Sequence, residues 1–277
     1  KIAFHYGADA CYVGGNVFGL RKFADNFSED ELRQAVDLAN HLNKKVYLVL
    51  NGFAHNTDID SLLPYFDILQ DIHPHAFIIS DMGVFKCAKE KTSVPIHIST
   101  QASVTNGYTC KFLKEAGAKR VVLAREVTIA ECADIQKLTN VELELFVHGA
   151  QCASYSGKCV ISNYASGRDS NRGGCVQSCR HRYDMRDNDS SDISESSHIM
   201  NAKDLMSVNL IPEFIHNRIH SFKVEGRMKS NLYVANTASA YRAAIDDCVN
   251  ALSSGKVFDP TPYETQLKQV SNRRFST

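Results

Sequence analysis

Seven short apolar segments, rich in β-branched residues, alternate along the chain with segments of helical periodicity. Continuously hydrophobic strands separated by helices are typical of parallel sheets, because crossover helices cover both faces of such a sheet. The predicted strands are "ACYVGG" (10–15), "KVYLVLN" (45–51), "AFIISD" (76–81), "PIHISTQ" (95–101), "RVVLARE" (120–126), "VELELFVHG" (141–149) and "SFKVEGR" (221–227). The pattern therefore predicts an α/β fold built from βαβ units.

The opening segment indicates how many strands this alternation requires. "KIAFHYGA" (1–8) resembles the end of a helix, which predicts an eighth strand in front of it. Eight βα units form a TIM-type (β/α)8 barrel. An open doubly wound sheet is the alternative, but no glycine-rich phosphate-binding turn follows an early strand. We predict a barrel whose first strand is missing from this chain, so that 141–149 is the seventh barrel strand.

Length and composition bound the domain organisation. With 277 residues and 44% hydrophobic content, the chain can bury one large core. We assign residues 1–250 to the barrel domain, including a cysteine-rich insertion over 150–186 that is too long for an ordinary βα loop. The acidic, serine-rich stretch 187–198 is predicted to be a surface loop. Residues 251–277 are predicted to be a C-terminal extension that leads to a further domain.

Two predicted helices carry recognisable start signals. "SEDELRQAVDLANHLN" (28–43) begins with Ser28 and Glu31 at the spacing of a capping box. "DIDSLLPYFDILQDIH" (58–73) has Asp58 or Asp60 as its N-cap. Both helices fit the crossover positions of βαβ units.

Polar side chains gather where the predicted strands end. In a barrel these ends form the catalytic face. The residues are Asn51, Asp81, Gln101, Arg125, Glu126, His148, Lys223, Glu225 and Arg227. We predict that Glu126, His148, Lys223 and Glu225 are catalytic. Gln101, Arg125 and Arg227, together with Arg168 and Arg172 of the insertion, are predicted to bind substrate.

The last predicted strand places three charges on one side. Lys223, Glu225 and Arg227 alternate with Val224 and Gly226, so all three are expected to point into the barrel. Unpaired buried charge is costly. We therefore predict an ion-pair network with Arg125, Glu126 and His148. The network is either purely structural or part of a site in which Arg227 or Lys223 binds a carboxylate.

Four of the nine cysteines lie in the insertion, with the spacing Cys-x6-Cys-x15-Cys-x3-Cys. They are Cys152, Cys159, Cys175 and Cys179. Structural zinc sites favour close cysteine pairs, whereas the spacings of four-thiolate iron–sulfur sites vary more. An iron–sulfur cluster, zinc, and disulfides or free thiols all remain open on this spacing. The other five cysteines lie in apolar or helical contexts and are predicted to be small buried residues of a protein in a reducing compartment.

The insertion is locally basic although the chain carries no net charge. A local patch of arginines can bind phosphate or carboxylate groups, balance a negatively charged cluster, or simply face solvent. The basic residues are Lys158, Arg168, Arg172, Arg180, Arg182 and Arg186. No apolar run is long enough for a membrane span, and no zinc-protease or serine-hydrolase motif is present. A Cys152–His148 nucleophile pair is a further alternative, but metal ligation explains four clustered cysteines more economically.

The stretch "ELFVHGAQCASYSGKCVIS" (144–162) resembles the signature of the collagenase-like peptidase family U-32. That signature runs Glu-x-Phe, then Gly-Ala-x-Cys, four residues, and Gly-x-Cys-x-aliphatic-Ser. Gln151 and Lys158 depart from it without removing a cysteine. Supporting stretches are "KIAFHYGADACYVGG" (1–15), "IHISTQASVTN" (96–106), "RVVLARE" (120–126), "NAKDL" (201–205) and "KVEGRMKSNLYVANTASAYRAAID" (223–246).

The resemblance implies a function that the residues alone leave open. Related hydroxylation proteins carry a [4Fe-4S] cluster and work without dioxygen on the tRNA wobble uridine, a ribosomal RNA cytidine or the ubiquinone ring. Prephenate is implicated as their oxygen donor. The pattern is most similar to the tRNA branch, whose product is 5-hydroxyuridine. By resemblance, Cys152, Cys159, Cys175 and Cys179 ligate the cluster, and zinc would take its place if the cluster were lost.

These implications lead to expectations about partners and to one alternative activity. The expected partners are tRNA, bound through the local basic loop, and a small dicarboxylate donor, without a membrane. The expected location is the cytoplasm. The alternative is a collagenase-like peptidase acting on collagen or another protein, and ubiquinone-ring hydroxylation is a lesser one.

Overall fold

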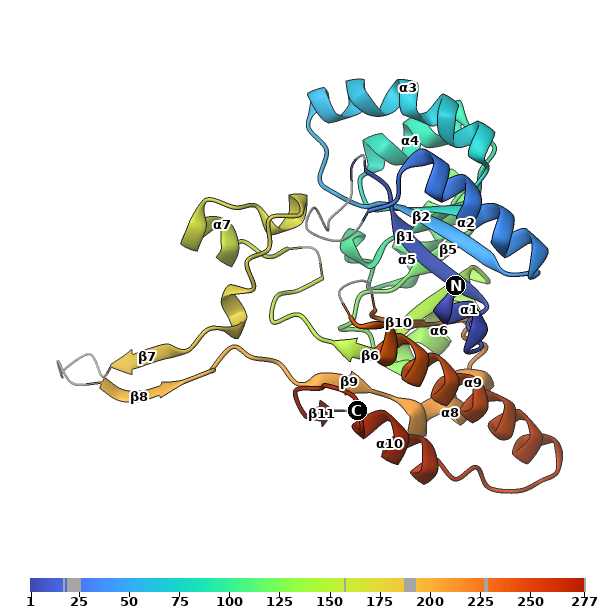
Figure 1. The fold of residues 1–277 in the computed structure, drawn as a ribbon, viewed down its shortest axis with the longest axis vertical. Coiled ribbons are helices and arrows are strands. Elements are labelled where there is room, and N and C mark those ends of the chain that lie inside the picture. The colour runs from blue at the N-terminus through green and yellow to red at the C-terminus, as the bar shows by residue number, and fades with distance from the viewer. Residues whose placement is uncertain (17, 19–25, 157, 187–192, 227–228, 277) are drawn as a thin grey trace.

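All seven predicted strands are present in one sheet. The computed structural model describes residues 1–277 except 17, 19–25, 157, 187–192, 227–228 and 277 (Figure 1). The strands are β1 (Ala10–Gly14), β2 (Lys45–Leu50), β3 (Ala76–Ile79), β4 (Ile96–Ile98), β5 (Arg120–Val122), β6 (Glu142–Ala150) and β10 (Ser221–Val224). β1 to β6 are parallel neighbours in chain order, and β10 pairs in parallel with β6. The predicted α/β fold is thus confirmed.

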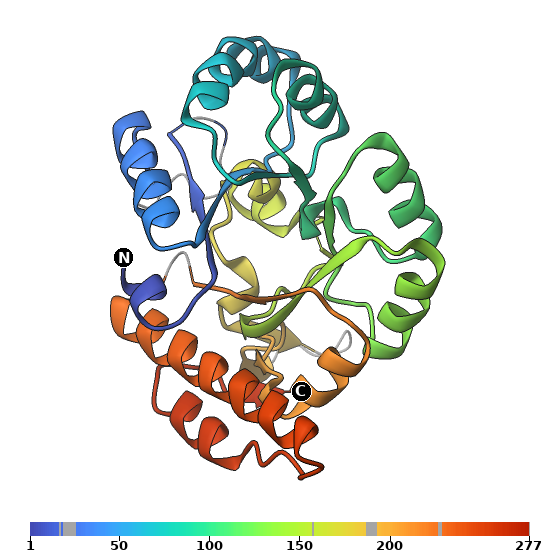
Figure 2. The same ribbon diagram turned by 90° about the vertical axis from the view of Figure 1, so that its right-hand side faces the viewer.

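Helices surround the curved sheet on its outer side (Figure 2). They are α1 (Ile2–His5), α2 (Glu29–His41), α3 (Asn56–Ile72), α4 (Met82–Lys91), α5 (Gly107–Ala116), α6 (Ile129–Thr139), α8 (Ile211–His216) and α9 (Asn231–Ser253). The capping box of α2 forms as predicted between Ser28 and Glu31. The predicted cap of α3 is wrong. The helix begins at Asn56, so its N-cap is His55. The main-chain N–H of His55 donates to Asp58 Oδ2 at 2.7 Å.

The closed barrel is not confirmed. Among the described residues no ladder joins β1 to β10, the two ends of the parallel series. These ends nevertheless face each other, because the Tyr12 hydroxyl donates to the Val224 carbonyl at 3.3 Å. The structure therefore establishes a curved, mostly parallel sheet, and the eighth strand stays a prediction.

The two faces of the sheet differ in chemistry. Strand residues such as Leu48, Phe77 and Leu143 pack with helix residues in one large apolar core. The inner face carries only a small apolar cluster, formed by residues such as Tyr47 and Ile78. Next to this cluster lie the buried ion pairs of Glu144 with Arg120 and Lys223, so the interior of the sheet is partly polar.

Four further strands were not predicted. β9 (Asp204–Met206) pairs antiparallel with the end of β6 and parallel with β11 (Phe275–Ser276). β7 (Tyr183–Arg186) and β8 (Ile193–Ser197) form a hairpin that projects from the body (Figure 1). The predicted loop 187–198 is therefore partly wrong, because its second half is β8, and 187–192 lie outside the described residues. These strands are short and lack the apolar runs that marked the others.

The C-terminal residues pack against the rest of the chain. α10 (Thr261–Lys268) lies on α9, where Asn236 Nδ2 donates to the Gln266 carbonyl at 3.0 Å. The division between 1–250 and 251–277 stays a prediction, although α9 itself continues to Ser253. No helix in the described part of the chain is both long and apolar enough to cross a membrane.

Candidate active site at the cysteine-rich insertion

A cavity of about 480 Å³ lies between the sheet and the insertion, and we call it the main pocket. Its sheet side is formed at the inner face and the carboxyl ends of the strands. The sheet-side lining includes Tyr12, Val49, Asn51, Ile78, Ser99, Thr100, Gln101, Arg125, Phe146, Lys223 and Glu225. The predicted site residues Gln101, Arg125, Lys223 and Glu225 are therefore brought together in one cavity.

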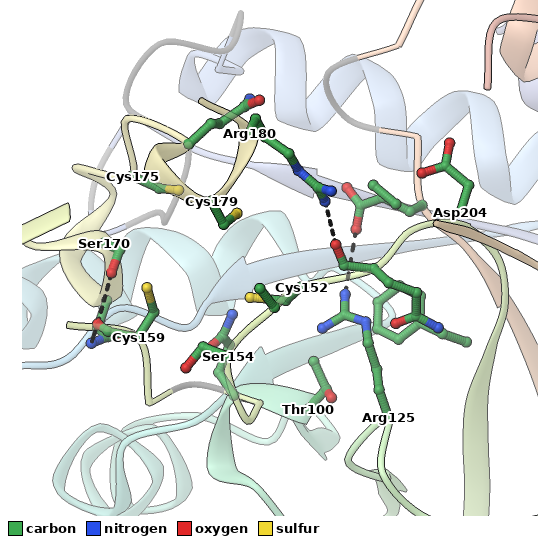
Figure 3. Close-up of a pocket in the computed structure, with 18 of the residues that line it drawn as sticks. Thr100, Arg125, Cys152, Ser154, Cys159, Ser170, Cys175, Cys179, Arg180 and Asp204 are labelled. Carbon is green, nitrogen blue, oxygen red and sulfur yellow. Dashed lines mark hydrogen bonds and ion pairs between the residues drawn. The ribbon is translucent and has the colours of Figure 1, made fainter. Parts of the chain in front are cut away.

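The four clustered cysteines line the main pocket from the other side. Cys152 follows β6, Cys159 precedes α7 (Ile161–Ser166), Cys175 lies in a loop and Cys179 is in a 3-10 turn. Figure 3 shows their sulfur atoms facing one common space. All nine cysteines are free thiols. Within the described part of the chain, no three His, Cys, Asp or Glu side chains are grouped closely enough to hold a single metal ion.

Burial and neighbouring groups shift the pKa of the Cys152 thiol. Burial raises the pKa of this thiol, and the charges of Cys159 and Cys179 raise it further. A hydrogen bond from the Ser154 N–H and the charge of Arg125 act in the opposite direction. Because ionised thiols this close repel one another, the group favours a positively charged ligand that all of them can share.

Glu126 anchors the insertion and does not line the main pocket. Its carboxylate accepts hydrogen bonds from the N–H and the hydroxyl of Ser156, both at 3.1 Å. Ser156 is buried, and its hydroxyl also accepts from the Arg125 N–H at 3.2 Å. In the structure Glu126 thus positions the insertion, and its predicted catalytic role stays a prediction.

The arginines of the insertion differ in what they contact. Arg172 donates to both carboxylate oxygens of Asp58, at 2.6 and 3.2 Å, and to the Phe53 carbonyl at 2.5 Å. The hydrogen bonds from Arg172 lower the pKa of Asp58. Arg172 thus docks the insertion on the loop after β2 and on the start of α3, and its predicted role in substrate binding stays a prediction. Arg168 does not line the main pocket either.

Arg180 was not predicted as a site residue, yet it lines the main pocket. It donates to the carbonyls of Gln151 and Ala202 and to the side chain of Asn201. The contact with Gln151 joins the two ends of the insertion beside Cys152, and the other two contacts attach the insertion to the segment before β9. Burial and the charge of Arg273 lower the pKa of Arg180.

The floor of the main pocket is an ion-pair network around Glu144. Lys223 Nζ lies 2.8 Å from Glu144 Oε1, and Arg120 and Ser221 donate to Oε2 at 3.2 and 2.8 Å. Burial by itself raises the pKa of Glu144, but the charge of Lys223 and these hydrogen bonds outweigh it and lower the pKa to about 2. The partner of Lys223 is therefore Glu144, a residue that the predicted network did not include.

Part of the predicted network does form at the rim. Arg125 Nη2 lies 3.9 Å from Glu225 Oε2, and the Arg125 guanidinium lies 4.2 Å from the centre of the Phe146 ring. Lys223 Nζ lies 4.5 Å from the centre of the Tyr12 ring. Arg227 lies outside the described residues.

His148 is not among the described residues that line the main pocket, and its predicted catalytic role stays a prediction. The register between β6 and β10 shifts at Val224, so Val147 has no partner and the alternation of side chains is interrupted. His148 packs against Tyr233 and Tyr241 of α9. Burial lowers its pKa to about 4, so the ring is neutral.

A second ion pair at the rim joins distant parts of the sequence. Arg273 donates to Asp204 Oδ1 from Nε at 2.8 Å and from Nη2 at 2.5 Å, and both residues line the main pocket. Neither was predicted, because both lie outside the seven strand ends. The stretch "NAKDL", which contains Asp204, was the available signal.

The fold and the cysteine pocket define a protein family. A model of peptidase family U32 matches residues 1–277, and the chain belongs to this family. The predicted resemblance is thus confirmed.

Three named proteins are among those with sequences similar to this chain. The tRNA hydroxylation protein P1 of Bacillus subtilis is 43% identical, over 96% of this chain and 70% of that protein. The 23S rRNA 5-hydroxycytidine C2501 synthase of Escherichia coli is 34% identical, over 89% of this chain and 37% of that protein. A collagenase of Porphyromonas gingivalis is 31% identical, over 99% of this chain and 68% of that protein.

Proposed function

We propose that this chain is an RNA-modifying hydroxylation enzyme that converts the tRNA wobble uridine to 5-hydroxyuridine without dioxygen. In this proposal it uses a [4Fe-4S] cluster and takes oxygen from prephenate. Similarity to proteins named for tRNA hydroxylation and rRNA 5-hydroxycytidine synthesis supports RNA as the substrate class. The observation that carries the proposal is a single pocket with four thiols on one side and cationic side chains on the other.

The thiols fit an iron–sulfur cluster by their number and arrangement. Clusters of this kind are held by four cysteine thiolates. A single zinc ion needs its sulfur ligands about 2.3 Å from the metal, and no three described ligands are grouped that closely. Cys152, Cys159, Cys175 and Cys179 would hold the cluster. If the cluster is lost, zinc would take its place only after the four sulfur atoms had moved closer together. When bound, the cluster would supply electron transfer.

The remaining groups suit an anionic donor and an unstacked base. Lys223 has N–H donors beyond the one used by Glu144, and the Arg125 guanidinium lies over the Phe146 ring. Arg180 and Lys229 add positive charge at the same rim, whereas the charge of Arg273 is balanced by Asp204. Two carboxylates of a donor such as prephenate, or a phosphate of RNA, can bind these cations. A base that undergoes chemistry at a ring carbon must first leave its stack, and the pocket mouth can receive it.

The peptidase alternative has a relative named as a collagenase but little support from the site. No histidine is among the described residues that line the main pocket, and His148 faces α9. Cys152 therefore has no imidazole base beside it, as a cysteine peptidase requires. RNA hydroxylation also leads us to propose the cytoplasm as the location.

The proposal is tested by replacing one ligand and one unrelated cysteine. Cys175→Ser is expected to abolish both the visible absorbance and the iron of anaerobically purified protein. It should also abolish 5-hydroxyuridine in tRNA nucleosides from a deletion strain carrying this variant. Cys87→Ser is the matched control, because Cys87 is half-buried on α4 and does not line the pocket. Iron-free native protein, or tRNA unchanged by the deletion, would overturn the proposal.

A further inference from the structure

A second cavity, of about 560 Å³, adjoins the main pocket, and we call it the side pocket. Gln101 lines both cavities and so forms a common wall. The other sides come from the loops after β2 and β3, from α5, and from Lys158 of the insertion. Nothing in the proposed hydroxylation uses this cavity, which lies at the same carboxyl edge of the sheet.

Large apolar side chains line the side pocket while remaining open to solvent. Phe112 of α5 is 64% exposed and Met82 of α4 is 44% exposed. Exposed apolar surface in a concave site is typical of ligand binding, because a ligand that covers it removes it from water. The side pocket therefore has the character of a binding site.

Phe53 gives the side pocket a fixed aromatic wall. Its N–H donates to the Asn171 carbonyl at 3.0 Å, and its carbonyl accepts from Arg172, which is itself paired with Asp58. The main chain of Phe53 is thus held by the insertion from both sides. With its main chain held in this way, Phe53 has only the rotamer freedom of its side chain to lose when a flat ligand stacks on the ring.

Charge in the side pocket favours a flat ligand that carries a phosphate. Lys158 Nζ lies 5.7 Å from the centre of the Phe53 ring, and Lys158 is exposed to solvent. The carboxylate of Asp81 accepts from the N–H groups of Gly83 and Val84 at the start of α4. Its charge is therefore partly balanced, and Lys158 remains the exposed cation beside the aromatic wall.

We propose that the side pocket binds the nucleobase next to the target base of a single-stranded RNA segment, and this rests on the proposed function. The neighbouring base would stack on Phe53 and Phe112, and Lys158 would lie beside its phosphate. Extraction of the target base into the main pocket removes the stacking partner of its neighbour. Aromatic side chains replace such a partner in many single-stranded RNA complexes. The shared wall at Gln101 suits two adjacent nucleotides in two adjacent cavities.

Phe112→Ala tests this inference against a matched control. Tyr108 is an aromatic residue on the same face of α5, is 79% exposed and lines neither pocket. Binding of a fluorescein-labelled RNA hairpin with a single-stranded loop is measured by anisotropy. Loss of one stacked base corresponds to a weakening of about 5- to 150-fold, which we expect for Phe112→Ala. Tyr108→Ala should bind like the native protein, and circular dichroism confirms that both variants fold.

A double-mutant cycle identifies the base that stacks. The same hairpin with an abasic nucleotide on either side of the target should bind the native protein more weakly at one of the two positions. At that position Phe112→Ala should cause no additional loss, because both changes remove the same contact. Lys158→Gln should reduce the slope of log affinity against log salt concentration by about 0.7, the value for one phosphate of a single strand.

The outcomes separate this inference from the proposed function. If the native protein binds the hairpin and Phe112→Ala behaves like Tyr108→Ala, the side-pocket inference is overturned and the RNA substrate stands. Additive losses in the cycle also overturn it. If the native protein does not bind RNA but binds a collagen-like peptide, both the inference and the proposed function fail.

Discussion

The sheet and the insertion are stabilised by different forces. Every residue of β3 is buried, as are five of the six residues of β2. In the insertion, the described residues that are buried are Ser156, Ser162, Gly173 and Ser178, and none of them has an apolar side chain. Apolar burial is the main force that stabilises folded proteins. The sheet can therefore fold on this force, whereas the insertion depends on individual polar contacts and, in our proposal, on a cluster.

The difference shows how one chain combines a stable frame with a specialised site. Hydrogen bonds at Glu126, Asp58 and Arg180 attach the insertion to the frame at a few points. Each such bond contributes only about 1 kcal/mol, so the insertion can be loosened without unfolding the sheet. The following changes test this separation, beginning with the largest expected effect.

Glu144→Gln should destabilise the whole sheet. The substitution removes the charge that pairs with Lys223 and Arg120 in the buried network. Breaking a buried ion pair on one side typically costs about 3–5 kcal/mol, because the partner charge stays buried. The free energy of unfolding in urea measures this loss. Glu142→Gln is the control, since Glu142 pairs with the same Arg120 but is more exposed, and an equal loss there would contradict the expectation.

Mild acid should weaken the sheet through two buried histidines. Burial, reinforced for His97 by the charge of Arg120, lowers the pKa of His97 to about 3, and burial lowers that of His148 to about 4. The unfolded chain binds these protons below about pH 6.5, while the folded chain does not. Stability should therefore fall as pH falls from 6.5, by about 1.4 kcal/mol per pH unit for each histidine.

Urea unfolding at a series of pH values measures this slope. His148→Phe suits the aromatic surroundings of His148 and should reduce the slope by the contribution of one proton between about pH 6.5 and 4. The same variant should retain hydroxylation if His148 is only structural. A complete loss of activity in a folded His148→Phe protein would support its predicted catalytic role.

Arg172→Ala should loosen the insertion alone. Its ion pair with Asp58 is partly exposed, so the expected loss is about 1 kcal/mol and is confined to the docking of the insertion. Limited proteolysis should cut the insertion faster, while the urea midpoint of the sheet stays close to that of the native protein. Arg182→Ala is the control, because Arg182 is exposed and donates only to the hairpin carbonyl of Ser196 among described contacts. A large shift of the urea midpoint would show that frame and insertion are one unit.

Local patterns in the sequence predicted the frame and the chemical character of the site. Apolar periodicity located all seven parallel strands, and the spacing of Ser28 and Glu31 located the start of a helix. Strand formation and helix capping could be predicted because each depends on residues only a few positions apart. The cysteine cluster likewise marked the site by composition. The motif resemblance identified the family, which the match over residues 1–277 confirmed.

Tertiary structure decided which charges meet. The extra residue at Val147 placed His148 against α9, and strand register paired Lys223 with Glu144. Asp204 and Arg273 are 69 positions apart and meet only because α10 folds back along α9 and β11 pairs with β9. Periodicity reports which face a side chain occupies within one element. It cannot report the partner across the fold, because that depends on register and packing between elements distant in sequence.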